Sequence, residues 1–421
     1  MNAFRVWHEL DAAAKRTFTA AFLGWTLDAF DFFLVTFVIT QLAHDFARSI
    51  PEIAFAVTLT LMFRPLGALI FGWLGDRFGR RRPLMVDIAL FGILELATAF
   101  SPNFTIFLVL RALFGIAMGG EWGLGAAMAM ESLPPKRRGL FSGILQEGYM
   151  VGYLLAALAF YLVATFTPWG WRGLFVIGAI PAVFVLYIRS AVPESRIWKD
   201  RISTRITSRA MLASFWRNAP LVIYTMLFMA AFNFLSHGTQ DLYATFLQKQ
   251  HGFAPAITSS IGIIAAFGAI AGGIVAGAVS QRMGRRMTIL VATVIGILVV
   301  PLWAYSQTIL ALAVGGFAMQ FAVQGAWGVI PAHLNELSPG DLRGTFPGFT
   351  YQIGNLISAG ALQIEATIAK TYFALPSGEP DYAKAMAVIA TSVLIIVGLL
   401  TLLGFAVKPE LRNADFAESS A

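Results

Sequence analysis

The amino-acid sequence predicts an all-α membrane protein with twelve transmembrane helices in two pseudo-symmetric six-helix bundles. Three observations predict this fold class: an apolar composition, about twelve apolar segments of spanning length, and a repeat between the two halves. The chain has 421 residues, of which 57% are hydrophobic and only 13% are charged. Because a soluble domain carries about 25% charged residues, this composition is typical of membrane proteins.

Several classes of site are excluded by composition and motif content. The chain has no cysteine, which excludes disulfides, thiolate zinc sites and cysteine nucleophiles. The net charge of +7 comes from short basic clusters between apolar segments, so we expect no binding of nucleic acid. Zinc-protease, nucleophile-elbow and phosphate-loop motifs are absent from the sequence. We therefore expect no enzyme, no cofactor and no metal site.

An apolar segment of about 20 residues is long enough to cross a bilayer as a helix. The first such segment is too long for the apolar core of a signal peptide, about 7–15 residues, so we expect it to be retained. We expect spans at residues 18–42, 53–75, 83–101, 104–130, 139–166, 171–191, 219–247, 255–280, 287–305, 308–334, 345–371 and 384–407.

Basic residues fall mainly on one side of this topology. The side with few of them carries only Arg48, Arg172, Lys249, Lys370 and Lys384. By the positive-inside rule the basic side is cytoplasmic, as are both termini. Residues 193–218 then form a linker between an N-terminal bundle (1–192) and a C-terminal bundle (219–421). The basic side carries Arg77, Arg80, Arg81, Arg82, Lys136, Arg137, Arg138, Arg196, Lys199, Arg201, Arg205, Arg209, Arg217, Arg282, Arg285, Arg286 and Arg343.

The two halves share a sequence repeat at one gap-free shift of 205 positions (336 − 131). "GDRFGRR" at 75–81 resembles "SQRMGRR" at 280–286. Two such halves predict bundles packed around a site near the middle of the membrane, as in secondary transporters. At this shift Gly120, Trp122, Gly123, Glu131, Pro134, Arg138 and Gly139 recur as Gly325, Trp327, Gly328, Glu336, Pro339, Arg343 and Gly344, and Asp28 and Asp31 align with Asn233 and Ser236.

Ionisable residues lie inside the expected spans. A charge at the centre of a bilayer costs about 2.5–3.5 kcal/mol on insertion scales, so such residues usually face a partner or a water-filled cavity. Their number here predicts a polar pathway, although Asp87 and Glu95, near span ends, fit a structural role better. The set is Asp28, Asp31, Arg64, Asp87, Glu95, Arg111, Glu121, Glu147, His237 and Asp241.

The seventh expected span contains the polar segment "NFLSHGTQDLYAT", 233–245. A polar stripe on a helix is typical of a helix that lines a cavity. The alternative is a set of hydrogen bonds between helices, which rarely needs both an imidazole and a carboxylate. At 100° per residue, one face of the helix carries Asn233, Ser236, His237, Gln240, Asp241 and Thr245.

Asp28 and Asp31 form a similar polar group on one face of the first expected span. They lie three residues apart, on one face of the helix. The repeat places them against the same cavity as the polar stripe. Two close carboxylates repel each other when both are ionised, which suits a proton carrier. The alternative is a fixed pair of acids neutralised by Arg64 or Arg111.

Three motifs resemble those of the major facilitator superfamily. "GWLGDRFGRR" (72–81) resembles the loop motif G-x-L-x-D-R-x-G-R-R, "RALFGIAMGG" (111–120) resembles R-x-x-x-G-x-x-x-G, and "PESR" (193–196) resembles the motif after the sixth span. The resemblance covers essentially the whole chain and implies that fold. It also implies that Asp76 pairs with the start of the eleventh span or with nearby arginines. Gating or structural roles are expected for Asp76, Arg77, Arg80, Arg81, Arg111, Glu131, Arg138, Glu336 and Arg343.

Narrower motifs resemble proton symporters of organic acids. "GGEWG" (119–123) and "DAFD" (28–31) are similar to motifs of the metabolite, sialate and aromatic-acid symporters. The seventh-span segment resembles N-x-x-[S/T]-H-x-[S/T]-Q-D-x-x-x-T of the Jen-type monocarboxylate/proton symporters in the sialate:proton symporter group. Gln352 and Asn355 match their Q-x-x-N. This resemblance implies proton-coupled uptake of lactate, pyruvate and similar short acids by alternating access. We expect a bacterial cytoplasmic (inner) membrane protein.

Such a substrate needs hydrogen-bond donors for its carboxylate and for its hydroxyl or keto oxygen. The candidates for substrate binding are Asn233, His237, Gln240, Gln352, Asn355, Tyr149, Tyr351, Gln146 and Arg64. For Arg64 the alternative is neutralisation of Asp28 or Asp31. The candidates for proton coupling are Asp28, Asp31, His237, Asp241, Glu121 and Glu147.

Two other functions stay open on the sequence alone. One is symport of a larger organic acid, either sialate or an aromatic acid, because substrate specificity changes easily on one fold. The other is a membrane sensor on a transporter scaffold, which needs an output module longer than the segment after Val407. The expected partners are a small organic monocarboxylate, a proton and the lipid bilayer, and we expect a monomer.

Overall fold

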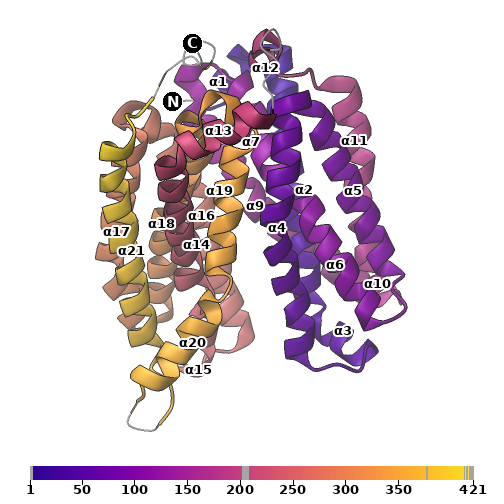
Figure 1. Ribbon diagram of the computed structural model, residues 1–421. Coiled ribbons are helices and arrows are strands. Elements are labelled where there is room, and N and C mark those ends of the chain that lie inside the picture. Colours follow the sequence, from indigo (N-terminus) through magenta and orange to yellow (C-terminus); the bar gives the residue numbers. More distant parts are fainter. Residues whose placement is uncertain (1–2, 202–207, 376–377, 412, 414–415, 417–421) are drawn as a thin grey trace.

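The computed structural model describes residues 3–201, 208–375, 378–411, 413 and 416. Regular secondary structure in these residues is helical, apart from one β-bridge between Ala374 and Pro380. Long helices run side by side in two groups, and both termini lie at one end of the molecule (Figure 1). We call this end the terminal face, and the other end the opposite face.

The first group contains the helices from α1 to α12, which end at residue 201. The short helices α1 (Ala3–Glu9) and α12 (Arg196–Arg201) lie at the terminal face, whereas α3 (Ile39–Asp45) lies at the opposite face (Figure 1). Between α7 and α8 lies the 3-10 helix η1 (Pro135–Arg137). The remaining helices are α2 (Ala12–Phe37), α4 (Ile50–Phe78), α5 (Arg81–Ala99), α6 (Phe104–Met118), α7 (Glu121–Ser132), α8 (Arg138–Gln146), α9 (Gly148–Phe166), α10 (Gly170–Ile177) and α11 (Ile180–Ala191).

The second group follows α13 (Ser208–Arg217), a helix at the terminal face. Part of the expected linker, residues 202–207, lies outside the described residues. In the second group the chain also forms a 3-10 helix, η2 (Gly340–Leu342). The helices are α14 (Ala219–Gln240), α15 (Tyr243–Lys249), α16 (Pro255–Met283), α17 (Arg285–Tyr305), α18 (Ile309–Leu337), α19 (Phe346–Ser358), α20 (Ala361–Tyr372) and α21 (Tyr382–Val407).

Nine helical stretches of the described chain are long and apolar enough to cross a bilayer, and each coincides with one expected span. The other three expected spans are also helical. The span at 83–101 is α5, which carries Asp87 and Glu95, while those at 171–191 and 345–371 are each divided into two helices. Broken helices are tolerated in membranes where neighbouring groups satisfy the freed backbone.

The first span begins earlier than residue 18, the expected start. α2 starts at Ala12, because Asp11 caps it by accepting a hydrogen bond from the Ala14 backbone N–H at 2.6 Å. A second cap starts α4, where Ser49 and Glu52 form a reciprocal capping box. These polar residues begin each helix outside the apolar segment that hydropathy detects.

The ends of α4 and α16 are built alike. Gly79 follows α4 with a φ of 99°, and Gly284 follows α16 with a φ of 103°. This conformation favours glycine, which has no Cβ. The two glycines are 205 positions apart, the shift of the sequence repeat. The repeat is therefore also a repeat of backbone geometry.

Close backbone contacts join the two groups near the terminal face. An added Cβ on Gly143 of α8 would lie 2.2 Å from the Gly273 carbonyl oxygen of α16. An added Cβ on Gly72 of α4 would lie 2.6 Å from the Cα atom of Thr345, next to α19. Larger residues at these glycines would force the groups apart at this end.

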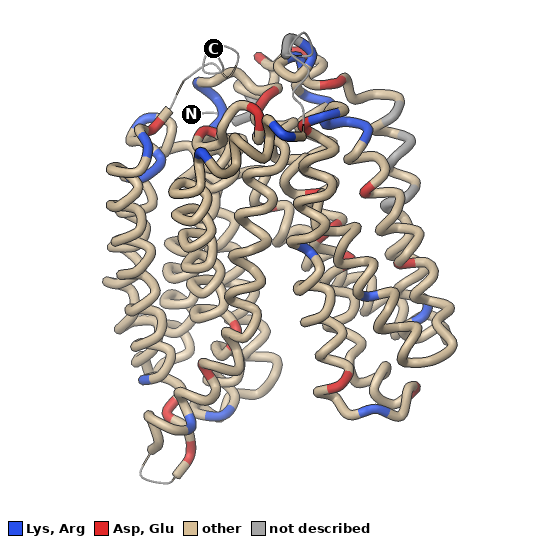
Figure 2. Tube along the Cα trace, in the orientation of Figure 1, with Lys and Arg blue, Asp and Glu red and all other residues tan. Residues whose placement is uncertain are grey.

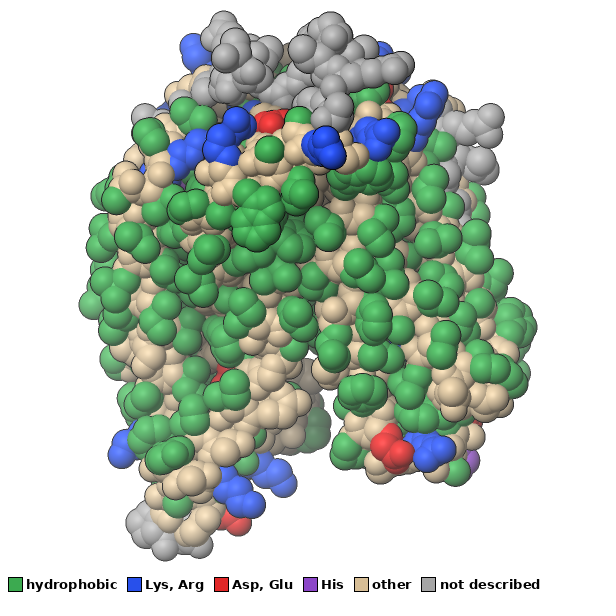
Figure 3. Space-filling model, in the orientation of Figure 1, with side chains coloured by type: hydrophobic (Ala, Val, Ile, Leu, Met, Phe, Trp, Pro, Cys, Tyr) green, Lys and Arg blue, Asp and Glu red, His purple; other side chains and the backbone are tan. Residues whose placement is uncertain are grey.

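The surface fits a bilayer. Charged residues gather at the two ends of the molecule, with few between them in this view (Figure 2). Hydrophobic side chains cover the belt between the ends, and a notch separates the two groups at the opposite face (Figure 3). Exposed members of this belt include Leu298 and Phe267, which are 73% and 64% exposed. A soluble protein rarely exposes a contiguous apolar surface of this extent.

Gly67 tests the close packing of α4 on α6. An added Cβ there would lie 1.8 Å from the Ile116 carbonyl oxygen. We expect Gly67→Ala to lower the free energy of unfolding by about 1–3 kcal/mol, the usual effect of overpacking, and to lower the melting temperature of the purified protein. Gly262→Ala is the control, because nothing lies within 4 Å of its added Cβ. Equal melting temperatures for the two variants would contradict this packing.

Candidate functional site

A cavity of about 510 Å³ lies between the two helix groups. Helices α2, α4, α8 and α9 line it on one side, and α14, α15, α16, α17, α18 and α19 line it on the other. It reaches toward the opposite face, where α15 and the first turns of α16 contribute Tyr243, Leu247 and Thr258. The cavity therefore lies on the same side of the molecule as the notch in Figure 3.

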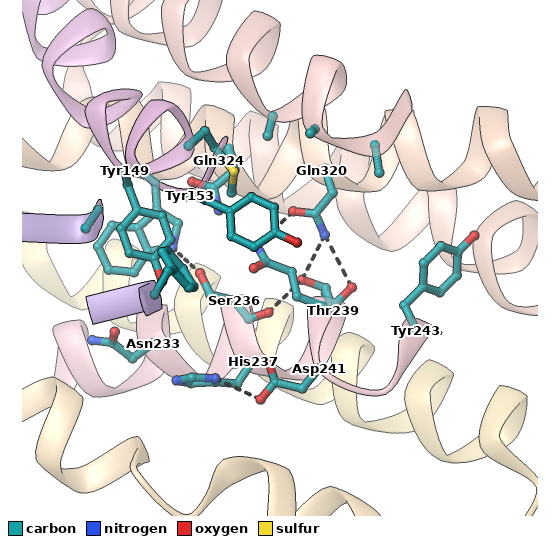
Figure 4. Close-up of a pocket in the computed structure, with 18 of the residues that line it drawn as sticks. Tyr149, Tyr153, Asn233, Ser236, His237, Thr239, Asp241, Tyr243, Gln320 and Gln324 are labelled. Atoms are coloured by element: carbon teal, nitrogen blue, oxygen red, sulfur yellow. Dashed lines mark hydrogen bonds and ion pairs between the residues drawn. The ribbon is translucent and has the colours of Figure 1, made fainter. Parts of the chain in front are cut away.

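The second group supplies a polar wall, most of it from α14 (Figure 4). The helix ends at Gln240, and helical structure resumes at Tyr243 in α15. As a result Thr245, which an unbroken helix would place on the same face, lies on α15 and does not line the cavity. The α14 stripe residues that do line it are Asn233, Ser236, His237, Gln240 and Asp241.

Hydrogen bonds fix the side chains of this wall. His237 Nδ1 lies 2.9 Å from the Asp241 carboxylate, Trp327 Nε1 donates to Ser236 Oγ at 2.7 Å, and Gln240 Nε2 donates to Gln320 Oε1 at 2.9 Å. The His237 and Asp241 side chains are 38% and 25% exposed. Both members of this titratable pair can therefore meet a solute in the cavity.

The first group supplies a wall with one buried ion pair. Arg64 Nη2 donates to both Asp28 carboxylate oxygens at 2.9 Å, and both side chains are almost fully buried. Arg64 thus neutralises Asp28 in this conformation, one of its two expected roles. Around the pair the lining is aromatic and comes from Trp25, Phe32, Phe33, Tyr149 and Tyr153.

Two further acids of the first group lie behind this wall. Asp31 and Glu121 are fully buried, do not line the cavity, and have carboxylate oxygens without a hydrogen-bond partner among the described residues. Arg111 pairs instead with Glu95 and donates to Thr98 Oγ1 at 3.0 Å. The alternative in which Arg111 forms the ion pair with Asp28 or Asp31 does not describe this conformation.

The remaining candidates divide between the lining and the layer behind it. Gln146, Tyr149, Tyr351 and Asn355 line the cavity. Gln352 is fully buried behind Asn355, whose Nδ2 donates to Gln352 Oε1 at 2.9 Å.

Glu147 is also buried behind the lining. It faces the seam between the groups rather than the cavity, because an added Cβ on Gly273 of α16 would lie 1.9 Å from its Oε1. Gln352 and Glu147 can act on a solute only through neighbouring residues.

Some lining residues are missed by the sequence analysis. Gln320, Gln324 and Trp327 all come from α18 and line the cavity. Their spacing of four and then three residues places them on one helical face. The same projection that found the α14 stripe would have found them. Their signal is weaker because amides and an indole carry no charge.

An aromatic layer closes the cavity on the side of the terminal face. Trp25 stacks on Tyr149 with ring centroids 5.7 Å apart, and Trp122 and Trp327 lie 4.5 and 5.9 Å from Tyr351. Trp122 and Trp327 are equivalent in the repeat, and the layer draws on both groups. Beyond it lie the glycine contacts of the seam, including Gly123 of α7 against Gly348 of α19.

Two equivalent polar contacts also cross the seam. Asp76 accepts hydrogen bonds from the backbone N–H groups of Gly344 and Thr345, at 2.7 and 2.9 Å, at the start of the eleventh expected span. Gln281 accepts from the backbone N–H of Gly139 at 2.8 Å. The shift of 205 relates Asp76 to Gln281 and Gly139 to Gly344. A carboxylate at a helix N-terminus is favourable because the helix dipole is positive there.

Ion pairs stabilise each group beside the seam. Arg80 pairs with Asp76 at 2.8 Å and with Glu131 at 3.3 Å, and Arg285 pairs with Glu336 at 2.7 Å. Four more of the expected gating arginines lie nearby: Arg77 stacks on Trp73, the Arg81 backbone N–H donates to Glu194, and Arg138 and Arg343 both face the ring of Phe416.

A central cavity between two repeat-related helix groups, closed at one end by equivalent contacts from both halves, is the architecture of a secondary transporter. The family model described as Major Facilitator Superfamily matches residues 21–362. The chain belongs to the major facilitator superfamily. It is a multi-pass membrane protein of the transporter fold, as its motifs predict.

Known relatives of this superfamily member include two transporters. The chain is 31% identical to the carboxylic acid transporter protein homolog of Saccharomyces cerevisiae over 90% of its own length, but spans only 66% of that protein. It is 29% identical to the probable 4-methylmuconolactone transporter of Cupriavidus pinatubonensis, covering 83% of this chain and 82% of the relative.

Among solved structures, the proton:xylose symporter XylE superposes with a TM-score of 0.77 at 18% identity, over 97% of this chain and 98% of that one. At this identity the likeness shows the fold alone.

The Asp28–Arg64 pair can be tested by a double-mutant cycle. We expect Arg64→Ala to lower the free energy of unfolding by about 3–5 kcal/mol, because it leaves a buried carboxylate unpaired. Adding Asp28→Ala should recover most of that loss, and melting temperatures of the purified proteins measure both effects. Additive losses in the double variant would show that the two side chains do not act as a pair.

Proposed function

We propose that this transporter is a proton-coupled symporter of short monocarboxylates such as lactate and pyruvate, and that it works by alternating access. One observation carries the proposal: a single cavity holds a His237–Asp241 pair on one wall and an Asp28–Arg64 pair on the other. The name of the yeast relative, a carboxylic acid transporter homolog, supports the substrate class.

The Asp28–Arg64 pair offers a direct route to coupling. Arg64 is a strong partner for a carboxylate because its guanidinium can form two parallel hydrogen bonds. In this conformation Nη2 of Arg64 donates to both carboxylate oxygens of Asp28. A proton on Asp28 weakens its hold on Arg64, which is then free to bind the carboxylate of the substrate. One proton therefore enters with one monoanion.

The opposite wall would hold the rest of the substrate. Asn233, Gln240 and Asn355 line the cavity with amide groups that can donate to a hydroxyl or keto oxygen. Gln320 orients Gln240 through their hydrogen bond. In this proposal His237 and Asp241 form the second titratable pair, while Asp31, Glu121 and Glu147 are reached only from behind the lining.

Orientation follows from charge. Basic residues gather at the terminal face, so we propose that this face and both termini are in the cytoplasm of a bacterial cell, at its cytoplasmic (inner) membrane. The cavity then reaches toward the outside, with the cytoplasmic end closed. Residues 1–192 and 219–421 would be the two bundles that rock about the substrate, joined by the 193–218 linker, in a monomer.

Symport of one proton with one monoanion moves no net charge. The membrane voltage, worth about 2.3 kcal/mol per charge per 100 mV, would not drive it. We expect labelled lactate to accumulate in proteoliposomes when a pH gradient, acid outside, is imposed, and a voltage alone to give no accumulation. Uptake that depends on voltage but not on the pH gradient would refute this stoichiometry.

Variants in the same assay locate the coupling residue. We expect Asp28→Asn to abolish accumulation driven by the pH gradient while lactate exchange across the membrane continues, because the asparagine cannot bind or release a proton. Asp31→Asn and His237→Ala are measured beside it. Normal accumulation by all three variants would show that the coupling residue lies elsewhere.

Size and aromatic lining favour a second candidate, symport of a larger organic acid. A cavity of about 510 Å³ exceeds the needs of lactate, and Phe32, Phe33 and Tyr153 can contact an apolar ring. The relative from Cupriavidus is named as a probable transporter of 4-methylmuconolactone. Competition of labelled lactate uptake by pyruvate, benzoate and sialate separates the candidates. Stronger competition by benzoate or sialate than by pyruvate would favour the larger acid.

A further inference from the structure

A short helix at the terminal face presents apolar side chains away from the protein. α13 runs across the ends of the long helices rather than along them (Figure 1). Met211 and Ser214 of this helix are buried, whereas Leu212 and Trp216 are 59% and 68% exposed. Leu212 and Trp216 are four residues apart, so they lie on one face of the helix. α13 therefore packs one face on the protein and directs an apolar face outward.

Arginines lie at both ends of this apolar face. Arg209 and Arg217 are exposed, and α13 itself contains no acidic residue. Arg217 Nη2 lies 4.0 Å from the Asp341 carboxylate, but 74% of the Arg217 side chain remains exposed. This contact leaves the guanidinium accessible to another anion. The outward face of α13 thus combines two apolar side chains with two accessible positive charges.

Contacts with both helix groups hold α13 in place. Phe215 packs edge-on against Phe349 of α19, with ring centroids 6.0 Å apart. At the other end of the helix, Ser208 Oγ accepts a hydrogen bond from Arg77 Nη1 of α4 at 3.2 Å. The apolar face therefore has a fixed direction, and α13 cannot turn it onto the protein without breaking these contacts.

The first helix group contains a comparable helix that is built differently. α1 also precedes the first long helix of its group and also lies at the terminal face. Its tryptophan, Trp7, packs against Phe18 and Phe141, with ring centroids 6.1 Å from each. A tryptophan of such a helix can thus be packed inside the protein. The exposure of Trp216 is a distinct feature of α13.

The edge of the bilayer matches the chemistry of this face. Only Asn218 separates α13 from α14, and the exposed residues Ile223 and Leu227 of α14 belong to the apolar belt. Basic side chains border that belt at the terminal face (Figure 3). α13 therefore lies where lipid headgroups lie, a depth at which tryptophan is favoured and basic residues attract anionic lipids.

The size of the apolar face argues against a protein partner. A stable protein–protein interface buries about 800 Å² on each partner. Two apolar side chains supply much less than that. A lipid headgroup with its upper acyl carbons needs only a small apolar surface beside a positive charge.

We propose that α13 is an interfacial helix that binds the phosphate groups of anionic phospholipids in the leaflet at the terminal face. Arg209 and Arg217 contact the phosphates, and Leu212 and Trp216 lie among the upper acyl carbons. Lipid bound there anchors the linker between the two helix groups to the membrane. This role goes beyond the proposed symport and does not depend on it, because α13 does not line the cavity.

The test uses the absence of cysteine from the chain. Ala213→Cys, at an exposed position of α13, carries a single fluorophore. The protein is placed in phosphatidylcholine vesicles with matched amounts of nitroxide-labelled phosphatidylglycerol or nitroxide-labelled phosphatidylcholine, and quenching gives the relative binding constants of the two lipids. We expect phosphatidylglycerol to bind about fivefold more tightly, the typical effect of one arginine at a bilayer surface.

Removal of the charges should remove this preference. In the Ala213→Cys background, we expect Arg209→Gln combined with Arg217→Gln to bring the two lipids within about twofold of each other. The melting temperature should not change, because both arginines are exposed. Salt at about 1 M should have the same effect, since it shortens the Debye length to about 3 Å.

Two controls use other exposed positions. Lys249→Gln combined with Lys370→Gln removes two exposed cations at the opposite face and should leave the preference at α13 unchanged. A fluorophore at Leu298→Cys, in the apolar belt, should be quenched equally by the two lipids.

Three results would overturn the proposal. Absence of quenching by either lipid at position 213 would show that this face does not meet the bilayer and is open to a soluble partner. Equal quenching by both lipids would show contact with the bilayer without selection of anionic headgroups. A preference for phosphatidylglycerol that persists in the double arginine variant would place the anion site elsewhere.

Discussion

The cost of an unpaired charge in an apolar medium organises this protein. Lipid offers no hydrogen bonds, so the spans are helices whose backbone groups are paired internally. The same constraint explains why Arg64 pairs with Asp28 and Arg111 with Glu95 inside the first group. Asp31 and Glu121 are buried acids whose carboxylate oxygens have no hydrogen-bond partner among the described residues. Because ionisable residues inside a membrane are costly and are often functional, these acids are candidates for a role in transport.

Residues that are equivalent in the repeat match more closely at the seam than at the cavity. At the seam the equivalents are close: glycine contacts, the Arg80 and Arg285 ion pairs, and the caps by Asp76 and Gln281 recur at one shift. At the cavity they differ, because Asp28 of the first group aligns in the repeat with Asn233 of the second. The repeat is thus closest where the two groups contact each other, and weakest at the cavity, where the proposed symporter would bind an asymmetric solute and a proton.

Much of this could be read from the sequence, for physical reasons. The α14 stripe is predictable because a polar face at helical period is conspicuous in an apolar segment. The loop motif left two partners open for Asp76, the eleventh span and nearby arginines, and the structure shows contacts with both. The sequence could not show which arginine pairs with which acid, because Arg64 and Arg111 were equal candidates to neutralise Asp28 and Asp31. The structure decides this, since Arg64 pairs with Asp28 and Arg111 pairs with Glu95. The interruption between α14 and α15, which separates Thr245 from the cavity-lining stripe, has no proline in or beside it, and Gly238 lies within α14. Gln320 and Gln324 were missed because uncharged amides barely change hydropathy.

The glycine contacts at the seam also define a mechanical element. Where Gly143 meets Gly273 and Gly72 meets Thr345, backbone touches backbone, and no side chain can bend to absorb a displacement. In the proposed alternating access, such a contact would act as a stiff pivot. A small rotation of one helix group about it would be carried along 29-residue helices such as α4 and α16, and would give a larger displacement at their far ends. These few glycine contacts, which cannot deform, would then determine how closely a motion at one membrane surface is coupled to a motion at the other.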